Sequence, residues 1–289
     1  MLRGLRQIGC HIRSHRRSAG SVAFRWDLYR TGWHQKWYEQ WFGPKANEIT
    51  VFHVTHHKAG SQWINRILHT IAYDRLVLPI PIARQFLELP IQRGKVYPTV
   101  YVTRQEFESV ALPPHSRRFV VIRDLRDTLI SAYFSIKHSH EMAAAEHLQM
   151  RARLQNCSLE DGLLYLLDNW YDDPTFASPT AVQRSWLGGP DDLLKYEDLL
   201  ENDERILEKV LLNHCRFPVD REQLRVSIRA NRFEVRSGRK RGEENISSHE
   251  RKGIAGDWKN YFSDKFARIF KDRYGELLVA TGYEANANW

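Results

Sequence analysis

The chain has 289 residues, of which 42% are hydrophobic, and a formal net charge of +8. This length and apolar content can bury one sizeable core, which excludes a disordered or fibrous chain and favours one domain. The three cysteines, Cys10, Cys157 and Cys215, are odd in number and lack metal-ligand spacing, which predicts a reduced, cytoplasmic protein. No apolar run approaches the roughly 20 residues that a membrane span needs.

The N-terminal region differs in composition from the rest of the chain. Residues 1–22 contain five arginines and two histidines but no acid, which predicts a basic, disordered tail, with a transit peptide as the alternative. We expect residues 23–289 to form the single domain. At its start, aromatic residues at helical spacing in residues 24–42 predict a helix packed on the core, although a membrane-surface role or a wall of an acceptor pocket is conceivable.

The segment VFHVTHHKAGSQW, residues 51–63, predicts a strand, a tight turn and the start of a helix. The turn, residues 58–61, places a lysine, a glycine and a serine at the helix N-terminus. Unpaired backbone N–H groups and the positive end of the helix dipole meet there, so a phosphate-like anion is the favoured ligand. Lys58 precedes Gly60, the reverse of the Walker A order, which disfavours metal-dependent hydrolysis of a nucleoside triphosphate.

A second strand–helix junction lies in RRFVVIRDLRDTLISAYFS, residues 117–135. Arg123 falls where the predicted strand ends, at the sheet edge where open parallel sheets bind ligands. Ser131 lies about two turns into the following helix, so its hydroxyl can face the same crevice. A guanidinium and a hydroxyl at one point suit a second phosphate. The three charged residues between them are predicted to form a solvated Arg–Asp ladder: Asp124, Arg126 and Asp127.

Two further segments carry candidate ligand-binding residues. The turn Arg251-Lys252-Gly253, within HERKGIAGDWKNYF, combines two cations with a glycine that lets the backbone close on an anion. Tyr196 follows a short apolar run and presents a ring at a strand end. A solvated basic loop is the alternative interpretation of the first segment.

Together these segments resemble the family of sulfotransferases that use 3′-phosphoadenosine 5′-phosphosulfate (PAPS), the cytosolic type with a P-loop-like sheet. The family's YPKSGTTW loop corresponds to residues 56–63. Its RDPRDxxxSxY motif is matched by Arg123 to Tyr133, with Leu125 in place of proline, and its RKGxxGDWKNxF motif is matched by Arg251 to Phe262. The order and spacing of the three motifs agree over most of residues 49–262.

The resemblance implies a role for each matched residue. Lys58 would contact the bridging oxygen and the sulfonate, in a loop whose remaining members cradle the 5′-phosphate. The 3′-phosphate would be held by Arg123, Ser131 and the turn at residues 251–253. An aromatic enclosure would surround the adenine, with Phe233 in a loosely matching segment. The implied cofactor-binding residues are Lys58, Ala59, Gly60, Ser61, Gln62, Trp63, Arg123, Ser131, Tyr196, Phe233, Arg251, Lys252 and Gly253.

One feature of the family is missing. The usual general base is a histidine in a KTHLP-like segment after a strand, but the corresponding stretch, YPTVYVTRQEFESV, has Arg104 at that place. An arginine stays protonated and cannot be the base, although it could stabilise the transferring sulfonate. Glu106 is the first candidate base, His56 and His57 are the alternatives, and an acceptor that needs no base is a further possibility.

The sequence therefore predicts an α/β fold, a parallel sheet of about four or five strands flanked by helices and similar to P-loop NTPases. The expected reaction is transfer of a sulfonyl group from PAPS to an acceptor hydroxyl or amine, without a metal ion. A P-loop kinase and a nucleotide-binding pseudoenzyme are the alternatives. The net charge would suit nucleic acid as well, but the basic residues of interest lie at strand–helix junctions rather than along one stripe, so no nucleic-acid partner is expected. The acceptor and the oligomeric state are not specified by the sequence.

Overall fold

The computed structural model describes residues 48–78, 85–139, 145–172 and 177–289. They belong to one compact unit, Asn47–Trp289. The tail predicted over residues 1–22 and the aromatic helix predicted over residues 24–42 lie outside the described residues. Within the described ranges, no helix is long and apolar enough to cross a membrane.

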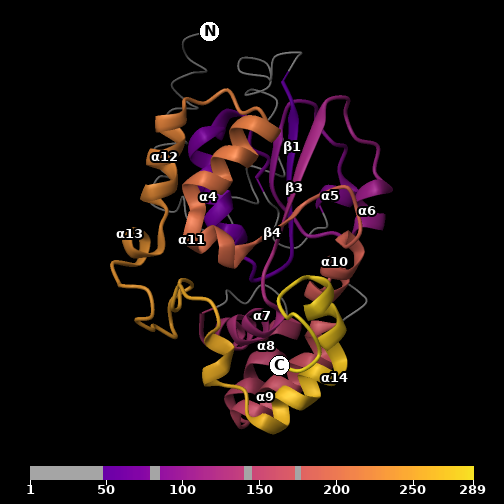
Figure 1. Ribbon diagram of the computed structural model, residues 1–289, viewed down its shortest axis with the longest axis vertical. Coiled ribbons are helices and arrows are strands. Elements are labelled where there is room, and N and C mark those ends of the chain that lie inside the picture. Colours follow the sequence, from indigo (N-terminus) through magenta and orange to yellow (C-terminus); the bar gives the residue numbers. More distant parts are fainter. Residues whose placement is uncertain (1–47, 79–84, 140–144, 173–176) are drawn as a thin grey trace, which may run out of the picture. The chain divides into compact units, whose positions relative to one another are not determined.

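The centre of this unit is a parallel sheet of four strands in the order β2-β1-β3-β4 (Figure 1). This confirms the predicted α/β fold. All six residues of β1 are buried, as expected for a strand in a sheet that is covered on both faces. The strands are β1 (Thr50–Thr55), β2 (Val96–Val100), β3 (Ser116–Ile122) and β4 (Leu193–Lys195).

Helices cover both faces of the sheet, and alternate residues of β1 face each layer. Val51 packs toward the layer that contains α4 (Ser61–Ile71), α11 (Tyr196–Leu207), η4 (Glu208–His214) and α12 (Arg221–Ala230). Phe52 and Val54 pack toward the other layer. That layer contains α5 (Gln85–Glu88), α6 (Arg104–Glu108) and α10 (Pro179–Trp186).

A third group of helices lies beyond the carboxyl ends of the strands, at the lower end of Figure 1. It comprises α7 (Leu125–Phe134), η2 (Ser135–Ser139), α8 (Ala145–Gln155), α9 (Leu159–Leu166), η3 (Leu167–Tyr171) and α14 (Asp264–Ala280). The remaining short elements are η1 (Tyr73–Arg75), α13 (Phe233–Ser237) and η5 (Asp257–Asn260). Any site at the carboxyl edge of the sheet is therefore enclosed between the sheet and this third group.

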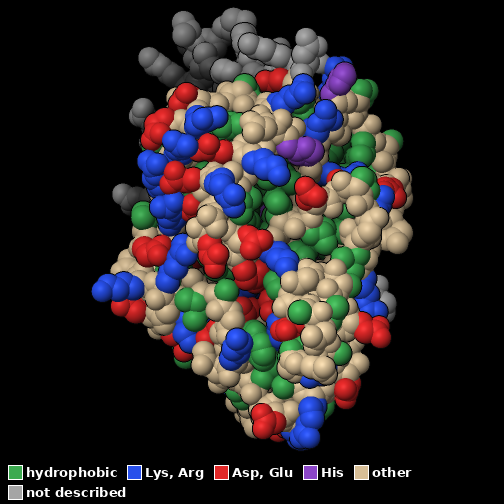
Figure 2. Space-filling view, in the orientation of Figure 1, with side chains coloured by type: hydrophobic (Ala, Val, Ile, Leu, Met, Phe, Trp, Pro, Cys, Tyr) green, Lys and Arg blue, Asp and Glu red, His purple; other side chains and the backbone are tan. Residues whose placement is uncertain are grey.

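The face of the molecule in Figure 2 carries Lys, Arg, Asp and Glu side chains intermixed over α11 and α12. Several of these are paired: Arg225 with Glu208, Arg229 with Glu204, and Arg232 with Asp203. This face therefore presents no continuous basic stripe of the kind that binds nucleic acid through its phosphates.

The prediction of a solvated Arg–Asp ladder at the start of α7 was wrong. Asp124, Arg126 and Asp127 are all buried. The Asp124 carboxylate caps α7 by accepting from the Arg126 backbone N–H at 2.8 Å and also pairs with the Arg126 guanidinium at 2.7 Å. Arg126 pairs in addition with Glu284, and its guanidinium lies 4.1 Å and 4.5 Å from the ring centres of Trp258 and Trp289. These charges therefore hold the C-terminal segment against α7.

We predict that Arg126→Met lowers the free energy of unfolding by about 3–5 kcal/mol, because it leaves two carboxylates without the cation that offsets their burial. Arg273→Met is the matched control: it breaks an exposed pair with Asp168 and should cost at most about 1 kcal/mol. Urea unfolding followed by tryptophan fluorescence measures both. Equal losses in the two variants would contradict the structural role of the buried pair.

Candidate functional site

The predicted anion-binding turn joins β1 to α4. Lys58 and Gly60 both have left-handed backbone conformations, with φ of 69° and 82°. No side chain caps the start of α4, so its first N–H groups are left for a ligand. A Cβ at Gly60 would lie 2.7 Å from the Tyr196 ring, so this position requires glycine for its backbone conformation and for space.

Arg123 lies beside this turn, as predicted. Its Nη1 donates to the Lys58 carbonyl oxygen at 3.1 Å, and its guanidinium lies 4.6 Å from the centre of the Tyr196 ring. The Nε atom of Arg123 is buried, and no hydrogen-bond partner for it is found among the described residues. A buried donor of this kind is costly unless a ligand satisfies it, so the residues fit a phosphate-bearing nucleotide.

The third basic segment, which contains Arg251, is held against α7. Asp127 accepts hydrogen bonds from the backbone N–H groups of Gly256 at 2.6 Å and Trp258 at 2.9 Å. The Arg251 guanidinium lies 4.6 Å from the centre of the Phe134 ring. Ser131, half-buried, is one turn before Phe134 on α7. The helix thus joins the segment that contains Arg251 to the segment that contains Ser131.

The cations of the third segment are paired within the protein. Asp257 accepts from Lys252 at 2.6 Å and is also bound by the Arg251 guanidinium. Arg251 is bound in addition by Glu244 and lies near the Tyr261 hydroxyl. A 3′-phosphate at these side chains would therefore share them with Asp257 or displace it.

The pKa of Lys58 is affected by cations from the other two basic segments. Burial, followed by the positive charges of Arg123 and Arg251, lowers the pKa of Lys58 to about 8. Arg123 and Arg251 are therefore close enough to Lys58 to disfavour its charged form. A bound anion would stabilise the charged form of Lys58, so this cluster favours anion binding.

The aromatic residues predicted for the adenine form two walls. Trp63 and Tyr196 meet edge to face, with 6.1 Å between their ring centres. The Phe233 ring lies directly over Gly253, where a Cβ would come within 2.5 Å of the ring. The two remaining predicted residues differ in exposure: Ala59 in the turn is buried, and Gln62 in the first turn of α4 is exposed.

The structure does not bring the two residues predicted for catalysis after β2 into this cluster. Glu106 caps its own helix, where its carboxylate accepts from the Thr103 backbone N–H at 2.8 Å and from the Thr103 hydroxyl at 3.0 Å. Arg104 pairs with Glu108 at 2.7 Å and lies against Gly189, in the loop before β4. In the stretch that corresponds to KTHLP, α6 begins at Arg104. The side chains of Arg104 and Glu106 therefore serve the helix and its neighbours at the place where a base was expected.

The two histidines of the donor loop have different surroundings. His56 is fully buried, and its Nε2 accepts from the Arg123 backbone N–H at 3.2 Å and from the Gln183 amide at 3.0 Å. Its Nδ1 then carries the proton and donates to the His57 carbonyl oxygen at 2.9 Å. Burial is the main cause that lowers the pKa of His56 to about 4. His57 is half-buried, and its ring stacks on Tyr101 with 4.0 Å between centres.

Four residues that support the site were missed in the sequence. Gln183 also donates to the Arg123 carbonyl oxygen at 2.7 Å, and Asp127 ties α7 to the third basic segment. Arg239 lies over the Phe233 ring and donates to the Arg251 carbonyl oxygen at 2.8 Å. Tyr101 contacts Ser61. Only Asp127 gave a signal, because the matched RDxRD pattern contains it.

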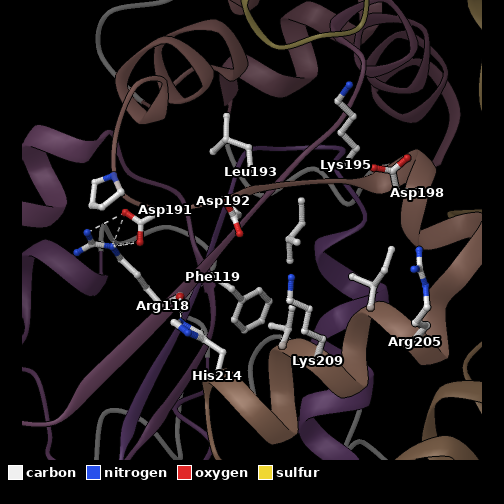
Figure 3. Close-up of a pocket in the computed structure, with 14 residues that line it drawn as sticks. Arg118, Phe119, Asp191, Asp192, Leu193, Lys195, Asp198, Arg205, Lys209 and His214 are labelled. Carbon is white, nitrogen blue, oxygen red and sulfur yellow. Dashed lines mark hydrogen bonds and ion pairs between the residues drawn. The ribbon is translucent and has the colours of Figure 1, made fainter.

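A separate hollow of about 470 Å³ lies beside the edge strand β4, between that strand and η4 (Figure 3). Arg118 and Asp191 form a bidentate ion pair at one end of it. Lys195 lines it, but its amino group donates to the Gly282 carbonyl oxygen at 2.6 Å. None of the predicted cofactor-binding residues lines this hollow. Among the described residues, no group of three or more His, Cys, Asp or Glu side chains is placed to hold a metal ion.

Comparison with known proteins agrees with this geometry. The model of the Sulfotransferase domain family matches residues 48–282. Human Sulfotransferase 2A1 is 23% identical over 255 residues, covering 78% of this chain and 85% of that protein. The 3-alpha-hydroxysteroid sulfotransferase of Cavia porcellus is 24% identical over 254 residues, covering 78% and 82%. The crystal structure of mouse sulfotransferase SULT7A1 complexed with PAP superposes with a TM-score of 0.57 at 20% identity, covering 81% and 86%.

The chain belongs to the sulfotransferase family, because the family model spans most of its length. It is a sulfotransferase, and neither the P-loop kinase nor the pseudoenzyme is favoured.

The lowered pKa of Lys58 predicts how binding of adenosine 3′,5′-bisphosphate depends on pH. Ligand phosphates raise the pKa of the bound lysine, so the protonated form binds better. Affinity should be constant between pH 7 and 7.5 and fall as pH rises through about 8, by up to roughly tenfold per pH unit because one proton is taken up.

Calorimetry from pH 7 to 9.5 measures this dependence. Lys58→Met should bind more weakly and lose the decline, whereas Lys265→Met, which removes a surface lysine paired with Glu160, should keep it. A wild-type affinity that is flat over this range would contradict the shifted pKa.

Proposed function

We propose that this protein transfers the sulfonyl group of PAPS to a hydroxyl group on an apolar, ring-bearing small molecule. The observation that supports this acceptor class is an aromatic wall beside Lys58. The His57 ring stacks on Tyr101, and the half-buried Trp170 lies 6.5 Å from His57, measured between ring centres. Flat apolar molecules bind well against such rings, which bury large areas. Two of the similar proteins are named hydroxysteroid sulfotransferases, which supports an apolar alcohol.

The donor would bind across the three basic segments. In this proposal Lys58 contacts the bridging oxygen and the sulfonate, while Gly60, Ser61 and Gln62 hold the 5′-phosphate. Arg123, Ser131 and the turn at residues 251–253 hold the 3′-phosphate. The adenine lies between Trp63, Tyr196 and Phe233. The contact of Arg123 with both Lys58 and Tyr196 supports this arrangement, since it joins the phosphate and adenine subsites.

The chemistry that these residues would supply is positioning and charge stabilisation. The acceptor oxygen attacks sulfur in line with the bond that breaks, and the leaving oxygen gains negative charge on the 5′-phosphate. A cation at Lys58 favours this step because its interaction strengthens as that charge develops. Holding both reactants in line removes much of the entropic part of the barrier.

His57 is our proposed general base. It is adjacent to Lys58 in the donor loop, and its half-buried ring stacks on Tyr101 in the aromatic wall. Glu106 caps α6, and His56 uses both ring nitrogens inside the protein. An imidazole needs little perturbation to accept a proton near pH 7.

We expect a donor-dependent screen to find phenols and sterol-like alcohols among the substrates, and simple saccharides to be inactive. The physical reason is that a saccharide cannot use the aromatic wall as fully as an apolar ring can. Release of adenosine 3′,5′-bisphosphate, together with mass spectrometry of the sulfated product, measures transfer. Turnover of saccharides but not of apolar alcohols would refute the proposed acceptor class.

His57→Asn should lower kcat by ~10²–10⁴-fold, the range for a lost general base, and leave the affinity for adenosine 3′,5′-bisphosphate nearly unchanged. The acidic limb of the pH–rate profile should disappear. Glu106→Gln is the comparison: it should keep kcat within a few-fold, and it should also keep the cap, because the amide oxygen of glutamine can still accept from Thr103. The reverse pattern would assign the base to Glu106.

A further inference from the structure

Two hydroxyl groups meet at the junction of the donor loop and β2. Tyr101 is the first residue after β2, and Ser61 is the first residue of α4. Their oxygen atoms are 2.8 Å apart. Because β1 and β2 are parallel neighbours, their carboxyl ends place these residues side by side. Tyr101, rather than Arg104, is therefore the residue that reaches the donor loop from this strand.

The position of the tyrosine ring relates it to the reacting end of the donor. One face of the ring is covered by His57, at 4.0 Å and an angle of 29° between planes. His57 is adjacent in sequence to Lys58, and Ser61 begins the helix whose N-terminus faces the 5′-phosphate. The Tyr101 hydroxyl is thus between the phosphate end of the loop and the aromatic wall proposed for the acceptor.

The number of protons in the hydroxyl pair limits what it can do. Each hydroxyl has one proton, and one of the two is used in the bond between them. The second hydroxyl proton is therefore available for a hydrogen bond to a group outside the pair. The first N–H groups of α4 already face the 5′-phosphate, whereas Lys58 is the one group proposed so far for the sulfonyl end of PAPS. A further hydrogen-bond donor is therefore most useful at the sulfonyl end.

We propose that Tyr101 is a catalytic residue that donates a hydrogen bond to a sulfonyl oxygen of the transferring group, while Ser61 donates to Tyr101. This rests on the proposed function of the site. It assigns to a neutral phenol the charge stabilisation that the sequence suggested for Arg104. The hydrogen bond strengthens as charge redistributes over the sulfonyl oxygens, so it lowers the barrier more than it tightens binding.

The complete step balances without any further reactant. The acceptor oxygen forms its bond to sulfur as the bond from sulfur to the bridging oxygen breaks. The electron pair of that bond stays on the bridging oxygen, which becomes an oxygen of the 5′-phosphate and is neutralised by Lys58. The acceptor proton passes to His57. Tyr101 keeps its own proton throughout, as burial raises its pKa above the usual value.

The experiment compares Tyr101→Phe with wild type in two assays. In the first, kcat for an apolar alcohol should fall about 10²-fold, the scale of one lost donor at an oxyanion site, and the affinity for adenosine 3′,5′-bisphosphate should stay within twofold. Phenylalanine keeps the ring that His57 stacks on, so only the hydroxyl is tested. Tyr97→Phe is the control, because its hydroxyl lies on the same strand and accepts from the Gln92 backbone N–H; it should leave kcat unchanged.

The second assay follows slow hydrolysis of PAPS to adenosine 3′,5′-bisphosphate and sulfate without an acceptor, where water attacks sulfur. Tyr101→Phe should slow it by a similar factor. A wild-type enzyme that hydrolyses PAPS in a Tyr101-dependent manner but sulfates no alcohol would overturn the acceptor class and support the role of Tyr101. Unchanged rates in Tyr101→Phe would overturn that role. So would a tenfold loss of nucleotide affinity, because Tyr101 would then position Ser61 for the phosphate.

Discussion

The site depends on one carboxylate that joins two segments far apart in the chain. Asp127 lies in the first turn of α7 and accepts from the backbone N–H groups of Gly256 and Trp258. This fixes the segment that contains Arg251 against the helix that contains Ser131. Hydrogen bonds to a charged, buried acceptor are among the stronger ones in proteins, so the junction is well defined. A second tie joins the third basic segment to the helix of the donor loop, because Glu250 pairs with Arg66 on α4 at 3.0 Å.

Carboxylates near this junction pair with several of its cations, so the cations can lie close together before a ligand binds. Arg251 and Lys252 face Asp257, and Arg126 faces Asp124 and Glu284. Lys58 and Arg123 are exceptions, since no carboxylate lies in an ion pair with either among the described residues. Burial is the main cause that lowers the pKa of Lys58, and the positive charges of Arg123 and Arg251 add to it. The chain thus pairs the cations that hold its own fold. At the donor loop, the charge of Arg123 is favoured by Asp127 and Glu197 without an ion pair, and Lys58 has no ion pair among the described residues.

The sequence predicted the fold and the proximity of Lys58 to Arg123 well, because both depend on local patterns. Short apolar runs ending in charged or Gly-bearing turns predicted the strands and the edge at which Lys58 and Arg123 meet. It failed for Asp124, Arg126 and Asp127, because alternating charges on a helix are typical of a solvated face. Their burial depends on Glu284, Trp258 and Trp289, which lie more than 130 residues away. No window of local sequence contains that information.

The catalytic side of the site was harder to predict for a related reason. The sequence could not rank His56 against His57, although the alternation of β1 separates them: His56 continues the face of Phe52 and Val54, which is covered by α10, where Gln183 lies. The motif match pointed to Arg104, whereas the structure places Tyr101 at the donor loop. Of the family's KTHLP segment, the chain keeps only the threonine, Thr103, so the alignment of the neighbouring residues is weak. The end of β2 at Val100 is needed to tell which side chain faces the donor loop. A role assigned from a weakly matched motif therefore needs the strand end to be located first.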